Sequence, residues 1–455
     1  MVIYIHPQTH MSFKEIVPFA VPALVNRVRQ RVPAVGRFHN EWTEKEIRNA
    51  RVVLMDVHWY LSIPGAIRLS HELKRANPDV KIVAGGLSAT LFAKPLLRDS
   101  AIDFIIRGDA LASTEALVRS VIEDAPADAV PNVIAREFEN PVSYAMSAEE
   151  FGEADFRDVS WFPSLRKAVV RIHRQSKGMA WPIHPWLIFY LGCPYDCAAR
   201  CYGPVPALQQ EVVQTAAVQP ERPELRDQAC YASTPNHRRL FRRGLLIRPP
   251  ERVREDLIAF KEDPDIRILH LVNDFSMLPP SYGERVLDQE YGLDISYLLI
   301  RLPTEDGLGR LLGAFRGGDL VFLHHWMDPD LRDAFVDRVL QAKATRRFRV
   351  WLTYSRVFCE RLPGYAETLN AIRRRVRCPA YEMDEWWDFA PDIGEDGTGT
   401  EEQYQACLRR ERIYAWHNLM FGVAMRCQYY SPRFTQAVLA LRRARIGEWL
   451  RKVRL

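Results

Sequence analysis

The chain has 455 residues, 47% of them hydrophobic, and a formal net charge of +5. This length and composition predict two or three domains with apolar cores and exclude a disordered or fibrous protein. The small positive charge indicates an anionic partner only weakly and does not identify nucleic acid as that partner. The N-terminus lacks the basic start and long apolar region of a signal peptide, and no run approaches the roughly 18 apolar residues of a membrane helix. We therefore expect a cytoplasmic protein with reduced thiols.

The first part of the chain, from Met1 to about Ala135, alternates short apolar runs with helix-like segments. This alternation predicts an α/β domain with a doubly wound, Rossmann-like parallel sheet. Gly65 to Ala76 has the pattern of an amphipathic helix that ends at Asn77-Pro78-Asp79. The expected strands are Val2 to Ile5, Arg51 to Asp56, Lys81 to Ala84 and Phe104 to Ile106.

A second series of strand and helix patterns covers residues 183–375, after a connector at 136–182 with little periodicity. Such repetition predicts a partial or full (β/α) TIM barrel, whose active site lies at the C-terminal ends of its strands. Helical patterns such as Pro250 to Glu262 and Pro329 to Lys343 fill the intervals. Residues 376–455 differ in composition and are expected to form a helical C-terminal extension. The expected strands are Trp186 to Leu191, Ile266 to Val272, Ile295 to Arg301, Leu320 to His324 and Phe348 to Thr353.

Three cysteines follow the first strand of this second series, in the stretch LGCPYDCAARCYG. Cys193, Cys197 and Cys201 are spaced so that one short loop can turn all three thiolates toward a common point. Three thiolates can hold an iron-sulfur cluster and leave one iron open for another ligand. A zinc site or a lost cluster, with Cys230 as a substitute ligand, stays open as an alternative, although zinc would require a fourth Cys or His nearby. The remaining cysteines are scattered, so no disulfide framework is expected.

This cysteine stretch resembles the cluster loop of radical S-adenosylmethionine (SAM) enzymes, in which the open iron takes the amino and carboxylate groups of SAM. The usual family pattern is C-x3-C-x2-C with an aromatic residue before the third cysteine. Here the last interval is one residue longer and Arg200 precedes Cys201. The resemblance implies a [4Fe-4S] cluster, bound SAM, and a low-potential electron donor of the flavodoxin or ferredoxin type.

The stretch from Val52 to Asp109 resembles the cobalamin-binding domain that precedes the barrel in one large class of radical SAM enzymes. The segments VVLMDVHWYLSIPGA, VAGGLSATLFA and IIRGDA carry this resemblance. Two glycines after a strand allow the backbone to approach a large ligand closely. For the RGD turn, a plain strand exit is the alternative. The residues that the resemblance implies at the cobalamin site are Asp56, His58, Trp59, Gly85, Gly86, Ser88, Arg107 and Gly108.

His58 is a candidate axial ligand, because Asp56-Val57-His58 looks like the start of the D-x-H-x-x-G motif of cobalamin-dependent mutases. However, Leu61 stands where that motif has glycine, and Gly85 follows too soon along the chain. We therefore expect cobalamin to bind with its base detached and without a protein histidine on cobalt. In this interpretation His58 and Trp59 pack beneath the corrin or in the core.

Polar residues end several expected barrel strands. The family resemblance places Asn273 and Asp274 near the SAM amino group, with a helix cap or turn as the alternative. Arg301 ends the third strand, where it could bind the SAM carboxylate bidentately or face solvent. His324 and Tyr354 end the fourth and fifth strands and are our catalytic candidates, at a barrel mouth where substrate or a proton acceptor would sit. Ordinary packing is the alternative for both.

The combined resemblance, from Val2 to about Arg375, implies a cobalamin-dependent radical SAM enzyme. A methyltransferase is the favoured activity, with the methyl group passing from methylcobalamin to a substrate radical on an unactivated carbon or a phosphinate phosphorus. A ring contraction or rearrangement enzyme of the same class is one alternative. A non-catalytic cobalamin-binding or sensing protein with a degenerate cluster site is another. No nucleic-acid motif stands out, so we expect a small-molecule or lipid-like substrate.

The C-terminal segment from Arg433 to Leu455 has the pattern of a basic amphipathic helix. Such a helix can pack as a solvated surface on its own domain, which is the commoner case, or contact an anionic membrane or a reductase.

Overall fold

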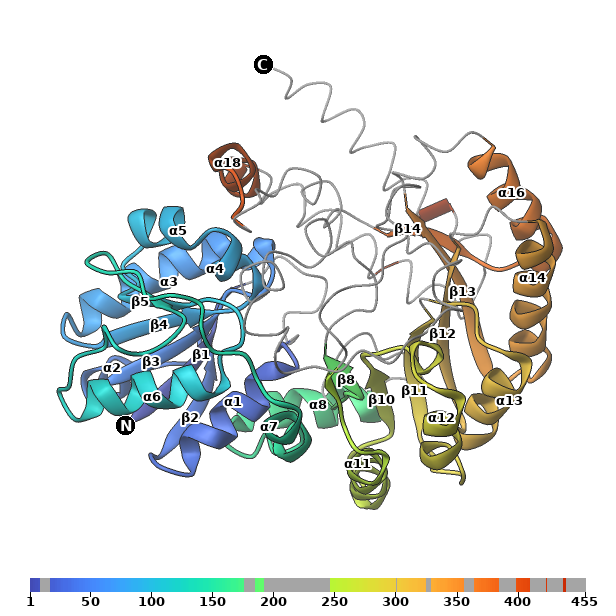
Figure 1. Ribbon diagram of the computed structural model, residues 1–455, viewed down its shortest axis with the longest axis horizontal. Coiled ribbons are helices and arrows are strands. Elements are labelled where there is room, and N and C mark those ends of the chain that lie inside the picture. The colour runs from blue at the N-terminus through green and yellow to red at the C-terminus, as the bar shows by residue number, and fades with distance from the viewer. Residues whose placement is uncertain are drawn as a thin grey trace.

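The chain folds into two α/β units that lie side by side, each built on a six-stranded sheet (Figure 1). The computed structural model describes residues 1–8, 17–175, 185–191, 246–299, 301–324, 329–355, 364–383 and 398–409, with the single positions 423, 437 and 438. The predicted cluster loop, with Cys193, Cys197 and Cys201, lies outside the described residues, as does nearly all of the basic C-terminal segment.

The first sheet has the strand order β2-β1-β3-β4-β5-β6, and its strands are parallel except for the last pair. The four expected strands are observed within about a residue, whereas β2 and β6 were not expected. Gly36 and Arg37 weaken the apolar signal of the edge strand β2, and Gly36 is needed because its missing Cβ would lie 2.5 Å from Phe162 Cγ. The bounds are β1 Val2–His6, β2 Ala34–Phe38, β3 Val52–Asp56, β4 Lys81–Gly85, β5 Phe104–Ile106 and β6 Val133–Ile134.

Helices cover both faces of this first sheet, because the strands are apolar on both faces. One face packs on α1 and α6, and the other packs on α2, α3 and α5. Since α1 follows β1 and α3 follows β3, the chain leaves these neighbouring strands toward opposite faces. The bounds are α1 Ala20–Arg29, α2 Glu44–Arg48, η1 Tyr60–Ser62, α3 Ile63–Ala76, α4 Leu87–Leu91, α5 Ala93–Asp99 and α6 Leu111–Ile122.

The expected connector contains two helices, α7 Ala148–Glu153 and α8 Pro163–Gln175. Leu165 and Val169 of α8 are fully buried in a core cluster that continues from the first sheet into the second. Ion pairs join the connector to the second unit, including Arg157 to Asp256 at 3.1 Å. The segment therefore fixes the two units to each other rather than only linking them.

The second sheet is entirely parallel, with the strand order β14-β13-β12-β11-β10-β7. Strand β14 lies beyond the expected limit of the barrel at residue 375. The helices lie along one side of this sheet (Figure 1). The bounds are β7 Trp186–Leu187, β10 Ile268–Leu271, β11 Asp294–Leu299, β12 Gly317–His324, β13 Phe348–Ser355, β14 Ala380–Met383, α11 Pro250–Glu262, η4 Phe275–Met277, α12 Pro280–Val286, α13 Glu305–Ala314, α14 Pro329–Ala344 and α16 Tyr365–Val376.

A separate antiparallel pair, β8 Tyr190–Leu191 and β9 Leu246–Ile247, follows β7. The expected single strand from Trp186 to Leu191 is thus divided between two sheets. Because Leu191 pairs with Leu246, this ribbon brings together the two ends of the segment 192–245, which contains the three clustered cysteines.

The last described helix, α18 Glu401–Arg409, returns to the first unit (Figure 1). Tyr404 and Cys407 are buried in the core on the α3 side of the first sheet. The Gly399 amide donates a hydrogen bond of 2.9 Å to the Leu91 carbonyl, and a Cβ at Gly399 would lie 2.4 Å from Phe92 Cε1. Residues 398–409 of the C-terminal extension are therefore anchored on the helices that follow β4.

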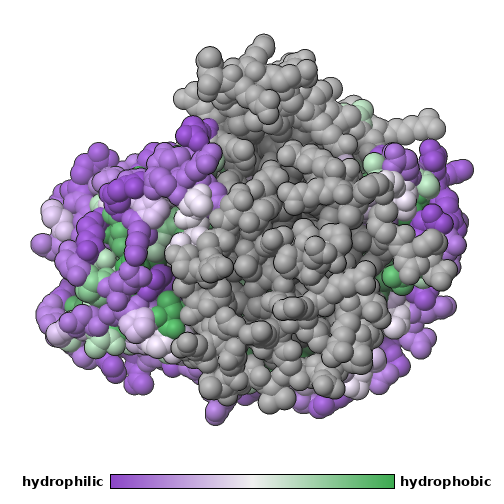
Figure 2. All heavy atoms as spheres, turned by 45° about the horizontal axis from the view of Figure 1, so that its top comes forward, coloured by the Kyte–Doolittle hydropathy of each residue, from purple (hydrophilic) through white to green (hydrophobic). Residues whose placement is uncertain are grey.

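The described surface is mainly hydrophilic on both flanks of the molecule (Figure 2). Among the described residues, the exposed large hydrophobic side chains are Met1, which precedes β1, Ile258 on α11 and Leu340 on α14. No helix in the described part of the chain has the length and apolarity needed to cross a membrane.

Candidate functional site

A buried polar cluster lies at the carboxyl ends of β1 and β3. Asp56 Oδ1 accepts a hydrogen bond of 2.5 Å from the Tyr4 hydroxyl and one of 2.8 Å from His6 Nδ1. Burial, together with the Asp56 carboxylate, raises the pKa of Tyr4 well above its usual value, so the hydroxyl keeps its proton. Because a carboxylate only accepts, Nδ1 carries the proton on the His6 ring, and Nε2 is the bare nitrogen of the neutral form.

This cluster lies where ligands bind in doubly wound sheets. The chain leaves β1 and β3 toward opposite faces, and the crevice at such a switch point is the usual ligand site. His6 and Asp56 are 1% and 5% exposed, yet His6 Nε2 and Asp56 Oδ2 have no hydrogen-bond partner among the described residues. Burying an unpaired polar atom typically costs about 1–3 kcal/mol, so these atoms indicate a place for a ligand group. The sequence pattern indicated Asp56 but not Tyr4 and His6, because these two residues stand in an apolar run that predicts an ordinary strand.

Gly85 and Gly86 have different structural roles at the end of β4. Gly86 has a φ of +109°, and a Cβ there would lie 2.8 Å from both the amide nitrogen and the Cα of His58. The glycine is therefore required by the neighbouring loop of the protein itself. At Gly85, by contrast, the only atom of the described residues within 4 Å of an added Cβ is the Ile106 carbonyl oxygen, at 3.8 Å. Of the two, Gly85 leaves room for a ligand.

His58 and Trp59 form the loop after β3 and contact each other edge to face, with ring centroids 4.5 Å apart. Burial lowers the pKa of His58 to about 4, so its ring is neutral at physiological pH. The His58 carbonyl accepts hydrogen bonds from the amide and hydroxyl of Ser88, at 3.3 and 3.1 Å. Ser88 therefore joins the loops after β3 and β4 at the edge of the sheet.

Arg107 and Gly108 lie at the end of β5. The Arg107 guanidinium is nearly buried and donates to Glu139 Oε1 and to the Asn140 carbonyl, both at 2.6 Å. Gly108 has a φ of +77°, and its amide donates to Thr90 Oγ1. These contacts are those of a strand exit, the alternative that the sequence left open.

In the second unit, Asn273 follows β10 and holds the chain that leads to the cysteines. Its Oδ1 accepts hydrogen bonds from the amides of Phe189 and Tyr190, at 2.8 and 3.2 Å. Phe189 lies between β7 and β8 and Tyr190 begins β8, shortly before Cys193. The Asn273 side chain thus fixes where the cysteine segment begins.

The Asp274 carboxylate is buried and satisfied by the protein. Oδ1 accepts from the Ser276 amide, the Ser276 hydroxyl and the Tyr297 hydroxyl, and Oδ2 accepts from the Arg301 amide. Burial raises the pKa of Asp274, and the donated hydrogen bonds act in the opposite direction. These donors use about all the lone-pair positions of a carboxylate, so Asp274 acts as a cap and joins the ends of β10 and β11. The Arg301 Nη1 donates to the Ser276 carbonyl at 3.1 Å.

His324 and Tyr354 lie side by side at the carboxyl ends of β12 and β13, as expected. Their side chains, however, face the helices. The His324 ring contacts the rings of Phe335 on α14 and Tyr365 on α16, at 5.4 and 5.0 Å between centroids. Tyr354 belongs to the same core cluster as these helices. The structure therefore favours ordinary packing, the alternative left open above, over a catalytic role for His324 and Tyr354, because the sheet itself lies between these side chains and its inner face.

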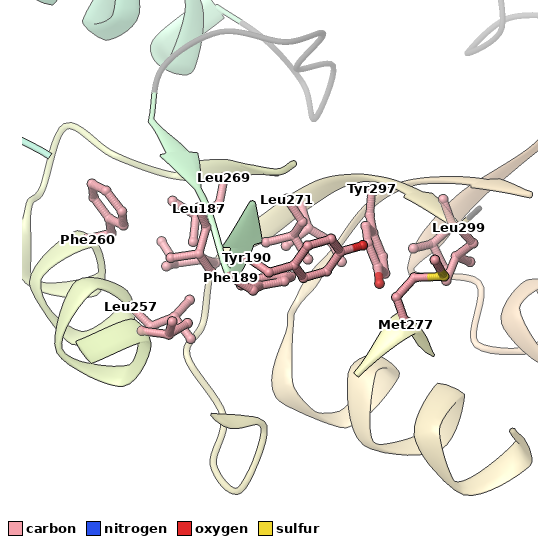
Figure 3. Close-up of a cluster of buried hydrophobic side chains, with 14 of the residues drawn as sticks. Leu187, Phe189, Tyr190, Leu257, Phe260, Leu269, Leu271, Met277, Tyr297 and Leu299 are labelled. Atoms are coloured by element: carbon pink, nitrogen blue, oxygen red, sulfur yellow. The ribbon is translucent and has the colours of Figure 1, made fainter. Parts of the chain in front are cut away.

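The side of the sheet that faces the helices is apolar, as a close-up of β7, β10 and β11 shows (Figure 3). There Leu187, Leu269 and Leu271 pack toward Leu257 and Phe260 of α11.

Because side chains alternate along a strand, the intervening residues face the other way. On the inner face of β12 and β13, the Asp319 carboxylate accepts hydrogen bonds from the Arg349 guanidinium and from Trp351 Nε1. Thr353 and Ser296 share this parity and are buried. The signal for these positions is the polar residue at alternate places in FRVWLTYS and the single aspartate within the otherwise apolar run GGDLVFLH.

One apolar cluster joins the regions on which the two predicted cofactor sites depend. Its buried core includes Phe151, Trp186 and Ile188, from the connector and the start of the second sheet. Trp59, from the loop after β3, and Leu191, which precedes the cysteine segment, both pack against it. The carboxyl edge of the first sheet and the origin of the cysteine segment therefore lie at the same interface between the two units.

No protein-family model matches the sequence, and no curated protein matches it significantly. The structure, however, resembles solved cobalamin-dependent radical SAM enzymes. The radical SAM methyltransferase TsrM from Kitasatospora setae, with tryptophan substrate and a SAM analogue bound, superposes with a TM-score of 0.56 at 11% identity. The match covers 84% of this chain and 72% of TsrM. A second TsrM structure contains cobalamin and a [4Fe-4S] cluster.

The cobalamin-dependent radical SAM enzyme OxsB, with aqua-cobalamin and SAM bound, superposes with a TM-score of 0.52 at 12% identity. The match covers 91% of this chain and 56% of OxsB, so the chain spans little more than half of that enzyme. At these identities the likeness establishes a shared fold. The architecture expected from the sequence, an α/β chain with parallel-sheet domains, is therefore confirmed.

The residues of the first unit fit a large cofactor at the carboxyl edge of its sheet. Gly85, which leaves space for a ligand, ends β4. The unpaired atoms of His6 and Asp56 are at the ends of β1 and β3, the next strands of the same sheet. The polar cluster supplies contacts for such a group, and Trp59 supplies an apolar surface beside it. In the second unit, the predicted cluster ligands lie outside the described residues, and Asn273 and the β8–β9 ribbon position the segment that carries them.

Proposed function

We propose that this protein is a cobalamin-dependent radical SAM enzyme and that it transfers a methyl group to a substrate radical. The observation that carries the proposal is the apolar cluster that joins Trp59, beside the candidate cobalamin site, to Leu191, just before the cysteine segment. Methyl transfer from cobalamin to a substrate radical requires the cluster-bound SAM and cobalamin to reach one substrate, and this interface brings their supporting loops together. The shared fold with TsrM and OxsB supports the same assignment.

When bound, the cluster would supply the electron that cleaves SAM, and cobalamin would supply the methyl group. The described residues have supporting roles in this proposal. Asn273 holds the start of the cluster segment, Asp274 fixes the neighbouring strand ends, and His6 with Asp56 contributes polar groups to the cobalamin crevice. We further propose that the electron comes from a flavodoxin- or ferredoxin-type donor and that the substrate is a small or lipid-like molecule.

The cluster part of the proposal is tested by anaerobic reconstitution with iron and sulfide, followed by a reductant and SAM. We expect a [4Fe-4S] absorption band and release of 5′-deoxyadenosine. Cys201→Ala should abolish both, and Cys230→Ala is the matched control that should retain both. Full activity in Cys201→Ala with loss in Cys230→Ala would move the third ligand to Cys230. If the wild-type protein shows neither the [4Fe-4S] absorption band nor 5′-deoxyadenosine, the enzyme assignment is rejected.

The methyl-transfer part is tested with methyl-labelled SAM and the cobalamin-loaded protein. Label that appears on cobalamin and then in product supports methyl transfer. Consumption of substrate with 5′-deoxyadenosine but without label in the product would instead assign a rearrangement.

A further inference from the structure

His6 combines three features that a purely structural histidine rarely shows together. Its side chain is 1% exposed, its Nδ1 is held by a carboxylate, and its Nε2 has no partner among the described residues. A histidine buried only for packing loses about 1–3 kcal/mol by leaving one ring nitrogen unpaired. The position at the end of β1, beside the switch point of the sheet, offers a reason for keeping that nitrogen free.

The contacts of His6 define which nitrogen is free and how firmly the ring is held. Asp56 Oδ1 accepts a hydrogen bond from the Nδ1–H of His6, and the same oxygen also accepts one from the Tyr4 hydroxyl. Phe38 contacts the ring edge to face, with centroids 6.0 Å apart. A carboxylate on one nitrogen and a bare lone pair on the other is the arrangement that histidine shows when it binds a metal ion, because the carboxylate fixes the tautomer and raises ligand basicity.

We propose that His6 Nε2 coordinates the cobalt of bound cobalamin from the side of the sheet, and that Asp56 and Tyr4 orient its ring. This inference rests on the proposed function, since cobalamin supplies the metal. In the coordination step, Nε2 donates its lone pair to cobalt, a bound water leaves, and no atom changes oxidation state. The inference revises the expectation that no protein histidine binds cobalt, which was drawn from the sequence position of His58. The sequence did not indicate His6 as a ligand, because no local motif connects it to Asp56.

The first test uses the protein without substitution. The wild-type chain is loaded with cobalamin, reduced to the Co(II) form and examined by electron paramagnetic resonance. We expect the cobalt lines to be split into triplets by one axial nitrogen, and labelling the protein with nitrogen-15 histidine should convert these to doublets. The isotope effect separates a protein histidine from the nitrogen base of cobalamin itself, which stays unlabelled.

Variants then identify the histidine. His6→Gln should remove the isotope-sensitive splitting, whereas His58→Gln, at the neighbouring loop, should keep it. Asp56→Asn should keep the splitting and weaken cobalamin binding by about 10- to 100-fold, as is usual when the partner of a metal-bound histidine is replaced. Circular dichroism and thermal melting check that each variant is folded.

The outcomes separate this inference from the proposed function. Wild-type protein that retains cobalamin but shows no isotope-sensitive splitting overturns only the coordination by His6, and so does splitting that persists in His6→Gln. Wild-type protein that does not retain cobalamin after desalting overturns both.

Discussion

Replacing His324 with phenylalanine tests whether this residue is part of the helix-side core or of the active site. The His324 ring is fully buried against Phe335 and Tyr365, and both of its nitrogens lack a partner among the described residues. Phenylalanine keeps an aromatic ring in this contact and removes the unpaired atoms. Since each unpaired buried polar group costs about 1–3 kcal/mol, we expect His324→Phe to be more stable than wild type by about 1–3 kcal/mol at about pH 7.5.

The pH dependence of the free energy of unfolding gives a second, independent test of the His324 environment. Burial lowers the pKa of His324 from 6.5 to about 4 in the folded state. In the unfolded chain His324 is protonated below about pH 6.5, whereas in the folded chain it is protonated only below about pH 4. The free energy of unfolding therefore falls as the pH falls through this window. Between about pH 7.5 and pH 5.5, His324 should account for a loss on the order of 1.4 kcal/mol. His324→Phe should lack this part of the loss.

The assay is urea denaturation at both pH values, monitored by fluorescence and circular dichroism, with the difference between variant and wild type taken at each pH. His71→Gln, on the exposed side of α3, is the control and should leave the pH difference unchanged. The reasoning is refuted if His324→Phe is less stable than wild type at the higher pH, or if it loses as much stability as wild type on acidification. Loss of 5′-deoxyadenosine formation in a folded, stabilised variant would restore the catalytic interpretation.

Three further perturbations test the packing around the two sites. Gly86→Ala should lower stability by about 1–3 kcal/mol because of its positive φ and the adjacent loop, whereas Gly85→Ala should melt like wild type and retain less cobalamin. Asp274→Asn places an amide donor among four donors and should cost about 2–3 kcal/mol in denaturant unfolding, while Asp294→Asn, in a half-exposed ion pair with an arginine, should cost less than about 1 kcal/mol. Gly399→Val should detach the α18 segment from the first unit, seen as faster hydrogen exchange at residues 398–409; unchanged protection would contradict the contact with Phe92.

The cofactor class was accessible to sequence reasoning because short local patterns carry it. The spacing of Cys193, Cys197 and Cys201, and the glycine pair after a strand, are features of single loops. The residue that we propose to coordinate cobalt was not accessible in this way. His6 becomes a candidate ligand only because its ring is hydrogen-bonded to Asp56. These two residues are in contact because β1 and β3 are neighbours in the sheet.

The sequence by itself determined the two α/β units, since alternating apolar strands and amphipathic helices are local patterns set by chain periodicity. Helix α11 was predicted at its observed bounds for this reason. Only the tertiary structure decided which side chains face a site. His324 ends an apolar strand as expected, yet its ring turns toward Phe335 and Tyr365, while Asp319 and Thr353 take the opposite face. The period of a strand divides its residues into two faces, but the helices that pack on the sheet decide which of these faces becomes the core.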